Sequence, residues 1–598
     1  MAARETIKVN VKRILLTIAF ASFILDGYAQ GLTPDASWLG SVETGKGEVL
    51  YLHTDRNFYA AGEDIQFMVY MNRDNTNTTP SKVLYLELTG NAGTAVSQKR
   101  TAVRDGIVRG IISIPDSITT GDYLLRAYTR QLTGSGLFSL CNVEIKVFNP
   151  FKNPMTPPES NGPVSADGST DSDLINPPAS SYEGLRVEMG SRFKTREKVS
   201  LKITTDPADT KQQQIKALSI SVAVKGATQN PTNESGSMRP AVNFFSQSVK
   251  KADSSIQPET LGPQLSGTLL NRTTLTPEPG IPVTLTYPGK IPCYQYSYTG
   301  STGVFNFTLP NREGWHDIVI HPSDLSTEWI VKLNSPYFEG VTTRSIKNEE
   351  WTPELIRMGE RLSINHQISE IYSDYKPAVK ESEVDLKKPD RFYDKAAHEI
   401  VMADYIVLPS LEEVFDELVP GITYRRSRSG HTFTVTNELS GLKSEEPPLV
   451  MVDGVIVTNH SALISLAPDI IERIDVIRRE YQLGHMHFSS IISIVTREGD
   501  KGDLNTVQPG VRTSYNALEP MVEKENLKYS DTRTAATRIP DFRNTLYWKT
   551  IVKPDRADNI ELEFFTSDYQ ADFTVDIKGV YTNGTPFSYS GIIRVSNK

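Results

Sequence analysis

The sequence predicts a mainly β, multidomain chain that contains one α+β domain. Short segments rich in Val, Ile and Tyr recur along most of the 598 residues, separated by turns that contain Gly, Asp or Pro. In the mature chain, apolar residues recur at helical spacing only between residues 352 and 466. Because domains average roughly 150 residues, a chain of this length is expected to form about four units.

The net charge and the cysteine content exclude several classes of protein. The formal charge is −9, whereas a nucleic-acid-binding protein needs a basic face, so we expect no nucleic-acid partner. Cys141 and Cys293 are the only cysteines, and they either pair or remain free thiols. Two cysteines build neither a disulfide framework nor a cysteine-based metal site. We therefore expect no metal and no cofactor.

Residues 1–29 have the features of a secretory signal peptide. Lys8, Lys12 and Arg13 precede the apolar run 14–25, and the small residue Ala29 stands at the expected cleavage point. The apolar run is too short to cross a bilayer, which needs about 20 residues. No later run is long enough either. The sequence therefore predicts an exported protein without a transmembrane span of its own.

Two β-units follow the signal peptide. Residues 46–148 contain period-2 or wholly apolar segments such as EVLYLHTD and GDYLLRAYT at roughly ten-residue spacing, which predicts an antiparallel sandwich. Residues 149–182 are rich in Pro, Ser, Gly and Asp, as is typical of a linker. Residues 183–336 predict a second β-sandwich region, interrupted by an internal linker at 227–262.

Helical signals appear in the next two segments. In the connector 337–395, Thr352 is a suitable N-cap and Pro353 suits the first helical position, which predicts a surface helix up to about residue 372. Residues 396–500 predict the α+β domain. It begins with a capping box at Ser410, and a short helix is expected at 461–466.

The remaining part of the chain is β again. Residues 501–540 are predicted as a linker and residues 541–598 as a C-terminal β-region. That region either forms a small domain or supplies strands to an earlier sandwich.

The α+β segment resembles the plug domain of TonB-dependent outer-membrane transporters. The matching pieces are PLVMVDGVIV (448–457), PDIIERIDVIRREYQLG (468–484) and FSSIISIVTREGD (488–500), in the order and spacing of that family. A transporter plug is followed by a barrel of about 22 strands of about ten residues each. Residues 501–598 are too few for such a barrel, so the resemblance implies a plug without its own barrel.

Residues 48–148 resemble the macroglobulin-like sandwiches of the alpha-2-macroglobulin superfamily. The resemblance rests on YLHTDRNFYAAGEDIQFMVYM, SKVLYLEL and PDSITTGDYLLRAYT. Larger members of the superfamily carry a thioester on Cys-Gly-Glu-Gln, which is absent here, so covalent protease trapping is excluded. Residues 264–310 are more loosely similar to carboxypeptidase-regulatory-type sandwiches. The combination resembles exported multidomain proteins of Bacteroidetes-type bacteria.

Several polar residues invite a catalytic or metal-binding interpretation. His485 and His487 would share one face of a strand as metal ligands, but no third ligand is nearby in sequence. Asp453 could be a catalytic carboxylate, but Asp-Gly is a favoured tight-turn pair. In His53-Thr54-Asp55-Arg56 neighbouring side chains alternate between faces and do not converge.

The remaining candidates are a cluster of arginines and the known catalytic sequence motifs. Arg425, Arg426 and Arg428 either contact anionic lipid or a partner, or charge a solvated strand edge. No catalytic sequence motif occurs. We therefore expect a protein that is not an enzyme.

The favoured hypothesis is a non-enzymatic interaction protein of the periplasm or outer membrane. Its plug-like domain would dock to a separately encoded outer-membrane barrel or envelope complex. The predicted contacts are Asp453, Gly454, Val455, Ile477, Arg478, Arg479, Tyr481 and Gly484. The alternative is a soluble periplasmic module that binds a ligand or protease through the macroglobulin-like domain. A hydrolase ranks last. The oligomeric state stays open.

Overall fold

The structure is a computed structural model. It describes residues 48–73, 80–90, 93–133, 141–152, 185–205, 214–228, 258–323, 328–338, 351–372, 379–381, 391–427, 430–501, 511–529, 538–554 and 559–597. The predicted signal peptide and most of the predicted linkers 149–182 and 227–262 lie outside these ranges. The chain is mainly β, with several sheets and one α+β domain, which confirms the predicted fold class.

The first sandwich packs a three-stranded sheet, β1-β3-β6, against a five-stranded sheet, β2-β8-β7-β4-β5. The strands are β1 (Glu48–Thr54), β2 (Phe58–Ala60), β3 (Asp64–Arg73), β4 (Val83–Thr89), β5 (Ala95–Ala102), β6 (Ile107–Ser113), β7 (Gly121–Tyr128) and β8 (Cys141–Phe148), with the short helix α3 (Arg130–Thr133). The strand β4 is buried at every position because both of its faces are covered.

The middle sandwich pairs the sheets β16-β13-β18 and β15-β14-β17-β29. Its strands are β13 (Gln264–Asn271), β14 (Pro282–Thr286), β15 (Tyr294–Tyr298), β16 (Val304–Thr308), β17 (Trp315–Pro322), β18 (Trp329–Leu333) and β29 (Val511–Asn516). The last of these follows the α+β domain in sequence. The chain therefore leaves the middle sandwich, builds the α+β domain, and returns to complete the same sheet.

The third sandwich answers the question that the sequence left open about the C-terminal region. Its sheets, β10-β34-β33-β12-β31 and β32-β11-β9, combine strands from both sides of the middle sandwich in sequence. The strands are β9 (Leu185–Met189), β10 (Arg192–Phe193), β11 (Lys198–Thr205), β12 (Ile215–Val224), β31 (Thr545–Val552), β32 (Asn559–Phe565), β33 (Asp572–Tyr581) and β34 (Pro586–Val595). The C-terminal strands thus supply partners to an earlier sandwich.

The predicted connector helix is confirmed as α4 (Pro353–Ile371), with Thr352 as the N-cap. It is not merely a surface element, because Ile356 and Leu362 are buried in the core of the third sandwich. Its Gly359 lies against the ring of Phe148 from the first sandwich, where an added Cβ would approach the ring to 2.5 Å. The helix therefore packs against two sandwiches.

The α+β domain has the five-stranded sheet β20-β25-β28-β23-β24. Its elements are β20 (His398–Val401), η6 (Met402–Asp404), α5 (Leu411–Glu417), β21 (Ile422–Ser427), β22 (Gly430–Val435), β23 (Leu449–Val452), β24 (Val455–Ile456), α6 (His460–Ile464), η7 (Pro468–Ile470), β25 (Ile471–Ile477), β26 (Tyr481–Leu483), β27 (Met486–Phe488) and β28 (Ile491–Thr496). Ser410 is the N-cap of α5, and its hydroxyl accepts a hydrogen bond from the Glu413 N–H at 3.2 Å. The short helix expected at 461–466 is present as α6. A further pair joins β19 (Val379–Glu381) to β30 (Val522–Lys524).

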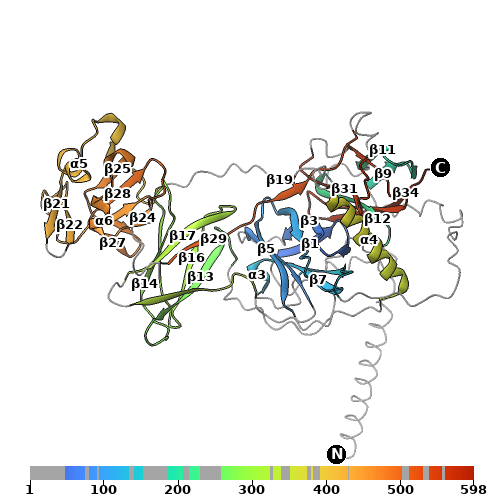
Figure 1. The fold of residues 1–598 in the computed structure, drawn as a ribbon, viewed down its shortest axis with the longest axis horizontal. Helices are drawn as coiled ribbons and strands as arrows, with labels where there is room; N and C mark the ends of the chain where they lie inside the picture. Colours follow the sequence, from blue (N-terminus) through green and yellow to red (C-terminus); the bar gives the residue numbers. More distant parts are fainter. Residues whose placement is uncertain are drawn as a thin grey trace, which may run out of the picture.

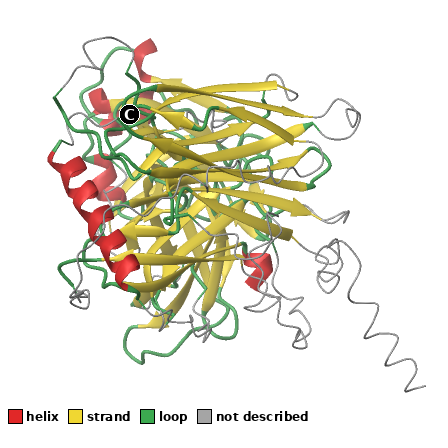
Figure 2. Ribbon diagram, turned by 90° about the vertical axis from the view of Figure 1, so that its right-hand side faces the viewer, coloured by secondary structure: helices red, strands yellow, loops and turns green. Residues whose placement is uncertain are grey.

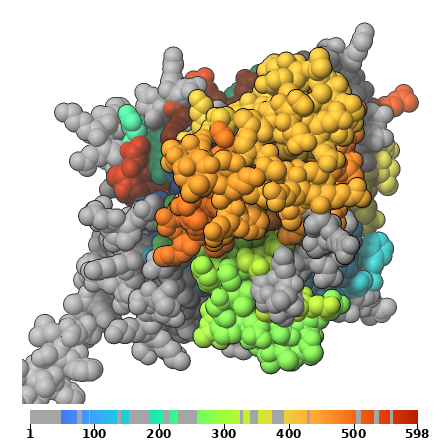
Figure 3. Space-filling model, turned by 90° about the vertical axis from the view of Figure 1, so that its left-hand side faces the viewer, coloured from blue at the N-terminus to red at the C-terminus, as the bar shows by residue number. Residues whose placement is uncertain are grey.

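The domains lie in a row. The α+β domain is at one end, the middle sandwich follows, and the first and third sandwiches lie together at the other end (Figure 1). The strand layers run through the body of the molecule, with the long helix along one side (Figure 2). Seen from its own end, the α+β domain lies directly against the middle sandwich (Figure 3).

The described residues bear on three further predictions. None of their helices has the length and apolar character needed to cross a membrane. They contain no group of three or more His, Cys, Asp or Glu side chains suited to a metal ion. Cys141 and Cys293 are both free thiols, the first buried and the second half-buried.

Candidate functional site

The Asp453-Gly454 pair forms the predicted tight turn, with φ values of 44° and 76°. The Asp453 side chain is fully buried and accepts hydrogen bonds from the Thr496 backbone N–H at 2.7 Å and the Thr496 hydroxyl at 2.6 Å. It also accepts one from the Lys501 N–H at 2.8 Å. Its carboxylate therefore ties β23 to the end of β28 and has no room for a substrate.

The same turn is pressed against the middle sandwich. The Gly289 N–H donates to the Asp453 carbonyl at 2.8 Å, and an added Cβ on Gly454 would lie 2.5 Å from the Tyr287 carbonyl oxygen. Val455, next along the chain, is 3% exposed. The turn at Asp453 and Gly454 therefore contacts the middle sandwich through its backbone, and Val455 is buried beside it.

Three further predicted contacts also lie against other parts of the chain. Ile477 is 3% exposed and belongs to an apolar cluster with Tyr294 of the middle sandwich. The hydroxyl of Tyr481 donates to the Phe392 carbonyl at 2.5 Å, and an added Cβ on Gly484 would clash with the hydroxyl of Tyr296. These residues lie against other parts of the same chain, and their role as contacts for a separate protein stays a prediction.

The last two predicted contacts are the arginines at positions 478 and 479. Arg478 is half-buried and donates a hydrogen bond to His398 at 2.9 Å. Arg479 is exposed and remains accessible.

The histidine and arginine candidates are exposed and separate. His487 lies 3.8 Å from Glu446 and 3.5 Å from Glu480, while the backbone N–H of His485 donates to Tyr296. Arg425 and Arg426 are exposed on the hairpin strand β21, and Arg428 lies outside the described residues. The metal interpretation and the lipid or partner interpretation gain no further support from these positions.

A Ser-His-Asp arrangement that the sequence did not indicate lies between the first and third sandwiches. His53 Nδ1 is 2.6 Å from Ser219 Oγ, and His53 Nε2 is 3.4 Å from a carboxylate oxygen of Asp576. The hydroxyl of Tyr70 is also 2.6 Å from Ser219 Oγ. The partners of His53 come from β12 and β33, so the sequence offered no local signal for them.

This trio is buried and cannot act as a hydrolase site. His53 is 1% exposed and Ser219 is inaccessible, so no substrate reaches the hydroxyl. Burial, with the charge of Lys578, lowers the pKa of His53 against the opposing effect of Asp576. Burial acts to raise the pKa of Asp576, but Lys578 and His53 together hold that pKa well below its usual range. The trio is a polar joint between two sandwiches.

The open site is a groove between the first and middle sandwiches, which we call the junction groove. It has a volume of about 420 Å³ and is lined by Ala95, Val96, Ser97, Gln98, Arg100, Trp315, Tyr337, Tyr515, Asn516 and Glu519. The first five come from β5, and the others come from β17, β29 and the segments that follow β18 and β29. Trp315 is 70% exposed, unusually high for so large an apolar side chain.

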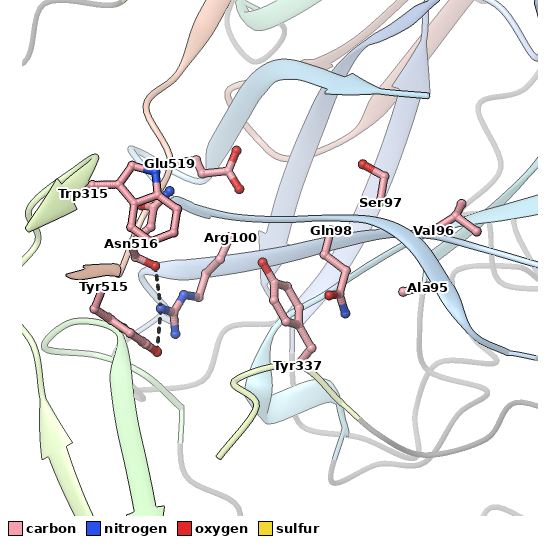
Figure 4. Close-up of a pocket in the computed structure, with 10 residues that line it drawn as sticks. All are labelled: Ala95, Val96, Ser97, Gln98, Arg100, Trp315, Tyr337, Tyr515, Asn516 and Glu519. Atoms are coloured by element: carbon pink, nitrogen blue, oxygen red, sulfur yellow. Dashed lines mark hydrogen bonds between the residues drawn. The ribbon is translucent and has the colours of Figure 1, made fainter. Parts of the chain in front are cut away.

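Arg100 and Glu519 are the charged residues that line the junction groove, and only 2% of Arg100 is exposed. Its guanidinium donates to the Gln264 carbonyl at 3.3 Å, the Tyr515 hydroxyl at 3.0 Å and the Asn516 carbonyl at 3.2 Å. Figure 4 shows the side chain extending from β5 toward the latter two residues. Its Nε is buried and has no hydrogen-bond partner in the described part of the chain.

The strand β5 forms one edge of its sheet, and only part of that edge is covered. The Glu519 N–H donates to the Arg100 carbonyl at 2.7 Å, and the Thr101 hydroxyl donates to the Glu519 carbonyl at 3.2 Å. Val96, nearer the start of the strand, is 37% exposed. The groove therefore combines an open strand edge with an aromatic wall.

Searches against protein families and against curated proteins find no match. Among solved structures, native E. coli alpha-2-macroglobulin is 8% identical, with 92% of this chain and 40% of that chain covered and a TM-score of 0.23. Salmonella alpha-2-macroglobulin reacted with methylamine is 10% identical, with 92% of this chain and 40% of that chain covered and a TM-score of 0.22. Red sea bream transglutaminase is 8% identical, with 50% of this chain and 34% of that chain covered and a TM-score of 0.13.

This chain spans about 40% of the length of those macroglobulins. At such low identities and TM-scores, the macroglobulin-like relationship of residues 46–148 stays a prediction. The plug-like relationship of residues 396–500 and the bacterial group of origin also stay predictions.

Proposed function

We propose that this chain is an exported, non-enzymatic binding protein that recognises its partner through the junction groove. One observation carries the proposal: an open groove at a domain junction presents the exposed indole of Trp315 beside an uncovered strand edge. Aromatic side chains and clefts between domains are typical of binding sites. Ser97 is the hydroxyl group of β5 in this groove, and no histidine lines the groove beside it as a base.

This proposal favours the alternative that the sequence offered, in which the first sandwich carries recognition. Most of the predicted docking face of the α+β domain is occupied by the middle sandwich, whereas the junction groove is open. Location in the periplasm or at the outer membrane belongs to the proposal and rests on the predicted signal peptide.

Docking of the α+β domain to an outer-membrane barrel is the second candidate, and a different surface favours it. Tyr405, Ile406 and Val407, just before α5, are 45%, 82% and 72% exposed. Three consecutive exposed apolar residues are unusual away from an interface. A barrel contact would use this segment rather than the predicted face around Val455.

Site-specific photo-cross-linking in intact cells tests both candidates. A photoreactive residue is placed at Val96 or Trp315 for the groove and at Ile406 for the α+β domain. Ile371, 75% exposed at the end of α4, serves as the control position. We expect one and the same protein to be captured from Val96 and Trp315, and not from Ile371.

The other outcomes are equally informative. Capture of an outer-membrane barrel from Ile406 alone would move recognition to the α+β domain. The absence of capture from all three positions would overturn the proposal.

A further inference from the structure

We infer that the junction groove holds an extended polypeptide segment of a partner protein, which adds to β5 as a new edge strand. This inference rests on the proposed function and deepens it by naming the occupant. It depends on two features of the groove: the free backbone edge of β5 and the aromatic wall.

The chain itself shows how a strand can add to this edge. The Glu519 N–H donates to the Arg100 carbonyl, so the backbone groups of Arg100 face away from β4 and toward the open edge. In an antiparallel pair, backbone groups alternate between the two edges of a strand with a period of two. The backbone N–H and carbonyl of Gln98 therefore face the same open edge as those of Arg100.

No described residue pairs with those backbone groups of Gln98. The start of β5, from Ala95 to Gln98, lines the groove, and Val96 is 37% exposed. An incoming strand would continue the pairing that Glu519 begins. A β-bulge opposite Leu88 and Thr89 interrupts the regular register near Val96, which limits the added strand to a short segment.

The aromatic wall suits the side chains of such a segment. Trp315 rises beside the edge and is mostly exposed, and Tyr337 and Tyr515 line the same groove. Alternate residues of an extended peptide point to one side, so one of them would pack on the indole while its backbone pairs with Gln98. Trp and Tyr are favoured contact residues because they combine large area with few rotatable bonds.

The charged groups of the groove are engaged within the chain. Arg100 is 2% exposed, and its guanidinium donates three hydrogen bonds to uncharged acceptors of the same chain. Glu519 pairs with Lys99 at 3.4 Å. Strand pairing and aromatic contact, rather than charge, are therefore expected to hold the segment.

A displayed library of seven-residue peptides, selected on the immobilised full chain, tests the inference. We expect selected peptides to contain an aromatic or β-branched residue. Binding should fall at least about thirtyfold on Trp315→Ala, the fold-change that corresponds to the roughly 2 kcal/mol lost when a hot-spot aromatic is truncated. Trp315 is exposed, so this variant should fold normally.

Two chemical variants of a selected peptide separate strand addition from other modes. N-methylation at every second residue should abolish binding in one register and spare it in the other, because only alternate N–H groups face β5.

The outcomes distinguish this inference from the proposed function. Equal binding of both N-methylated registers, or no selected peptide at all, would overturn strand addition. Binding of oligosaccharides that is lost in Trp315→Ala would overturn it as well, while leaving a binding groove in place. Failure of the cross-linking experiment would overturn the proposed function itself.

Discussion

The middle sandwich forms two junctions of opposite character. Toward the α+β domain it is closed: the turn at Asp453-Gly454 inserts against Tyr287 and Gly289, and Ile477 packs with Tyr294. Toward the first sandwich it is partly open, and the junction groove remains between β5 and Trp315. The closed junction resembles a domain core, whereas the open one has a polar and aromatic wall.

The difference shows that apolar character alone does not identify a binding surface. The sequence near Val455 and Ile477 is strongly apolar, and the structure buries it within the chain. The groove is built from residues that look ordinary in sequence, such as Gln98, Arg100 and Trp315. What marks the groove is an exposed indole beside a free strand edge.

The largest expected effect on the α+β domain comes from removing the Asp453 carboxylate, which ties β23 to the end of β28. Asp453→Ala leaves the buried N–H and hydroxyl of Thr496 without an acceptor, and each unsatisfied buried donor costs about 1–3 kcal/mol. We expect the α+β domain to lose about 3 kcal/mol of stability by hydrogen exchange of β23 and β28. Asp453→Asn keeps one acceptor oxygen and should lose less; equal effects of both variants would contradict this account.

A second change tests the docking of the turn rather than its internal bonds. Gly454→Ala places a methyl group against the Tyr287 carbonyl oxygen at a φ of 76°. Gly441→Ala is the matched control, with a φ of 68° and no atom within 4 Å of the added Cβ. Both variants carry backbone strain of about 1–3 kcal/mol, but only the first should separate the α+β domain from the middle sandwich.

Limited proteolysis and small-angle scattering measure this separation. We expect an expanded particle for Gly454→Ala and an unchanged one for Gly441→Ala. An identical response of the two variants would show that the Tyr287 contact does not hold the junction.

A smaller effect is expected at the polar joint between the first and third sandwiches. Burial lowers the pKa of His53, so below about pH 6.5, the ordinary value, the unfolded chain binds a proton that the folded chain resists. Stability therefore falls as pH decreases from that value. The charged neighbours that bear on His53 are Asp55, Asp576 and Lys578, of which Lys578 adds to the lowering and the two carboxylates oppose it.

His53→Gln removes the titrating group and keeps hydrogen-bonding atoms for Ser219 and Asp576. We expect the melting temperature of the variant to drop less than that of the native chain between pH 7.5 and pH 5.5. The lowered pKa of Asp576 acts only below its ordinary value of about 4, outside this window. Parallel drops for the two proteins would show that His53 does not contribute.

Local features of the fold followed from the sequence, whereas features built from distant segments did not. The N-caps at Thr352 and Ser410 and the Asp453-Gly454 turn depend on neighbouring residues, and all three are present. The pairing of β12 with β33 joins residues that lie hundreds of positions apart, and an alternating strand pattern does not name its partner.

The same reasoning explains which sites were predicted. A turn carboxylate such as Asp453 stands out in sequence, but its burial depends on the middle sandwich. The trio of His53, Ser219 and Asp576 and the junction groove each combine side chains from different sandwiches. No spacing along the chain brings such residues together, so only the folded arrangement reveals them.

The smallest expected effect on stability comes from the open junction. It tests most directly whether this junction, unlike the closed one, serves recognition rather than folding. Trp315→Ala removes a side chain that is 70% exposed, so the free energy of unfolding should change by no more than about 0.5 kcal/mol. Trp329→Ala, in the same sandwich but 8% exposed, should cost about 3–5 kcal/mol. Thermal unfolding measures both, and cross-linking from Val96 measures capture of the partner. A stable Trp315→Ala chain that captures nothing would separate recognition from folding, whereas unaltered capture would remove Trp315 from the binding site.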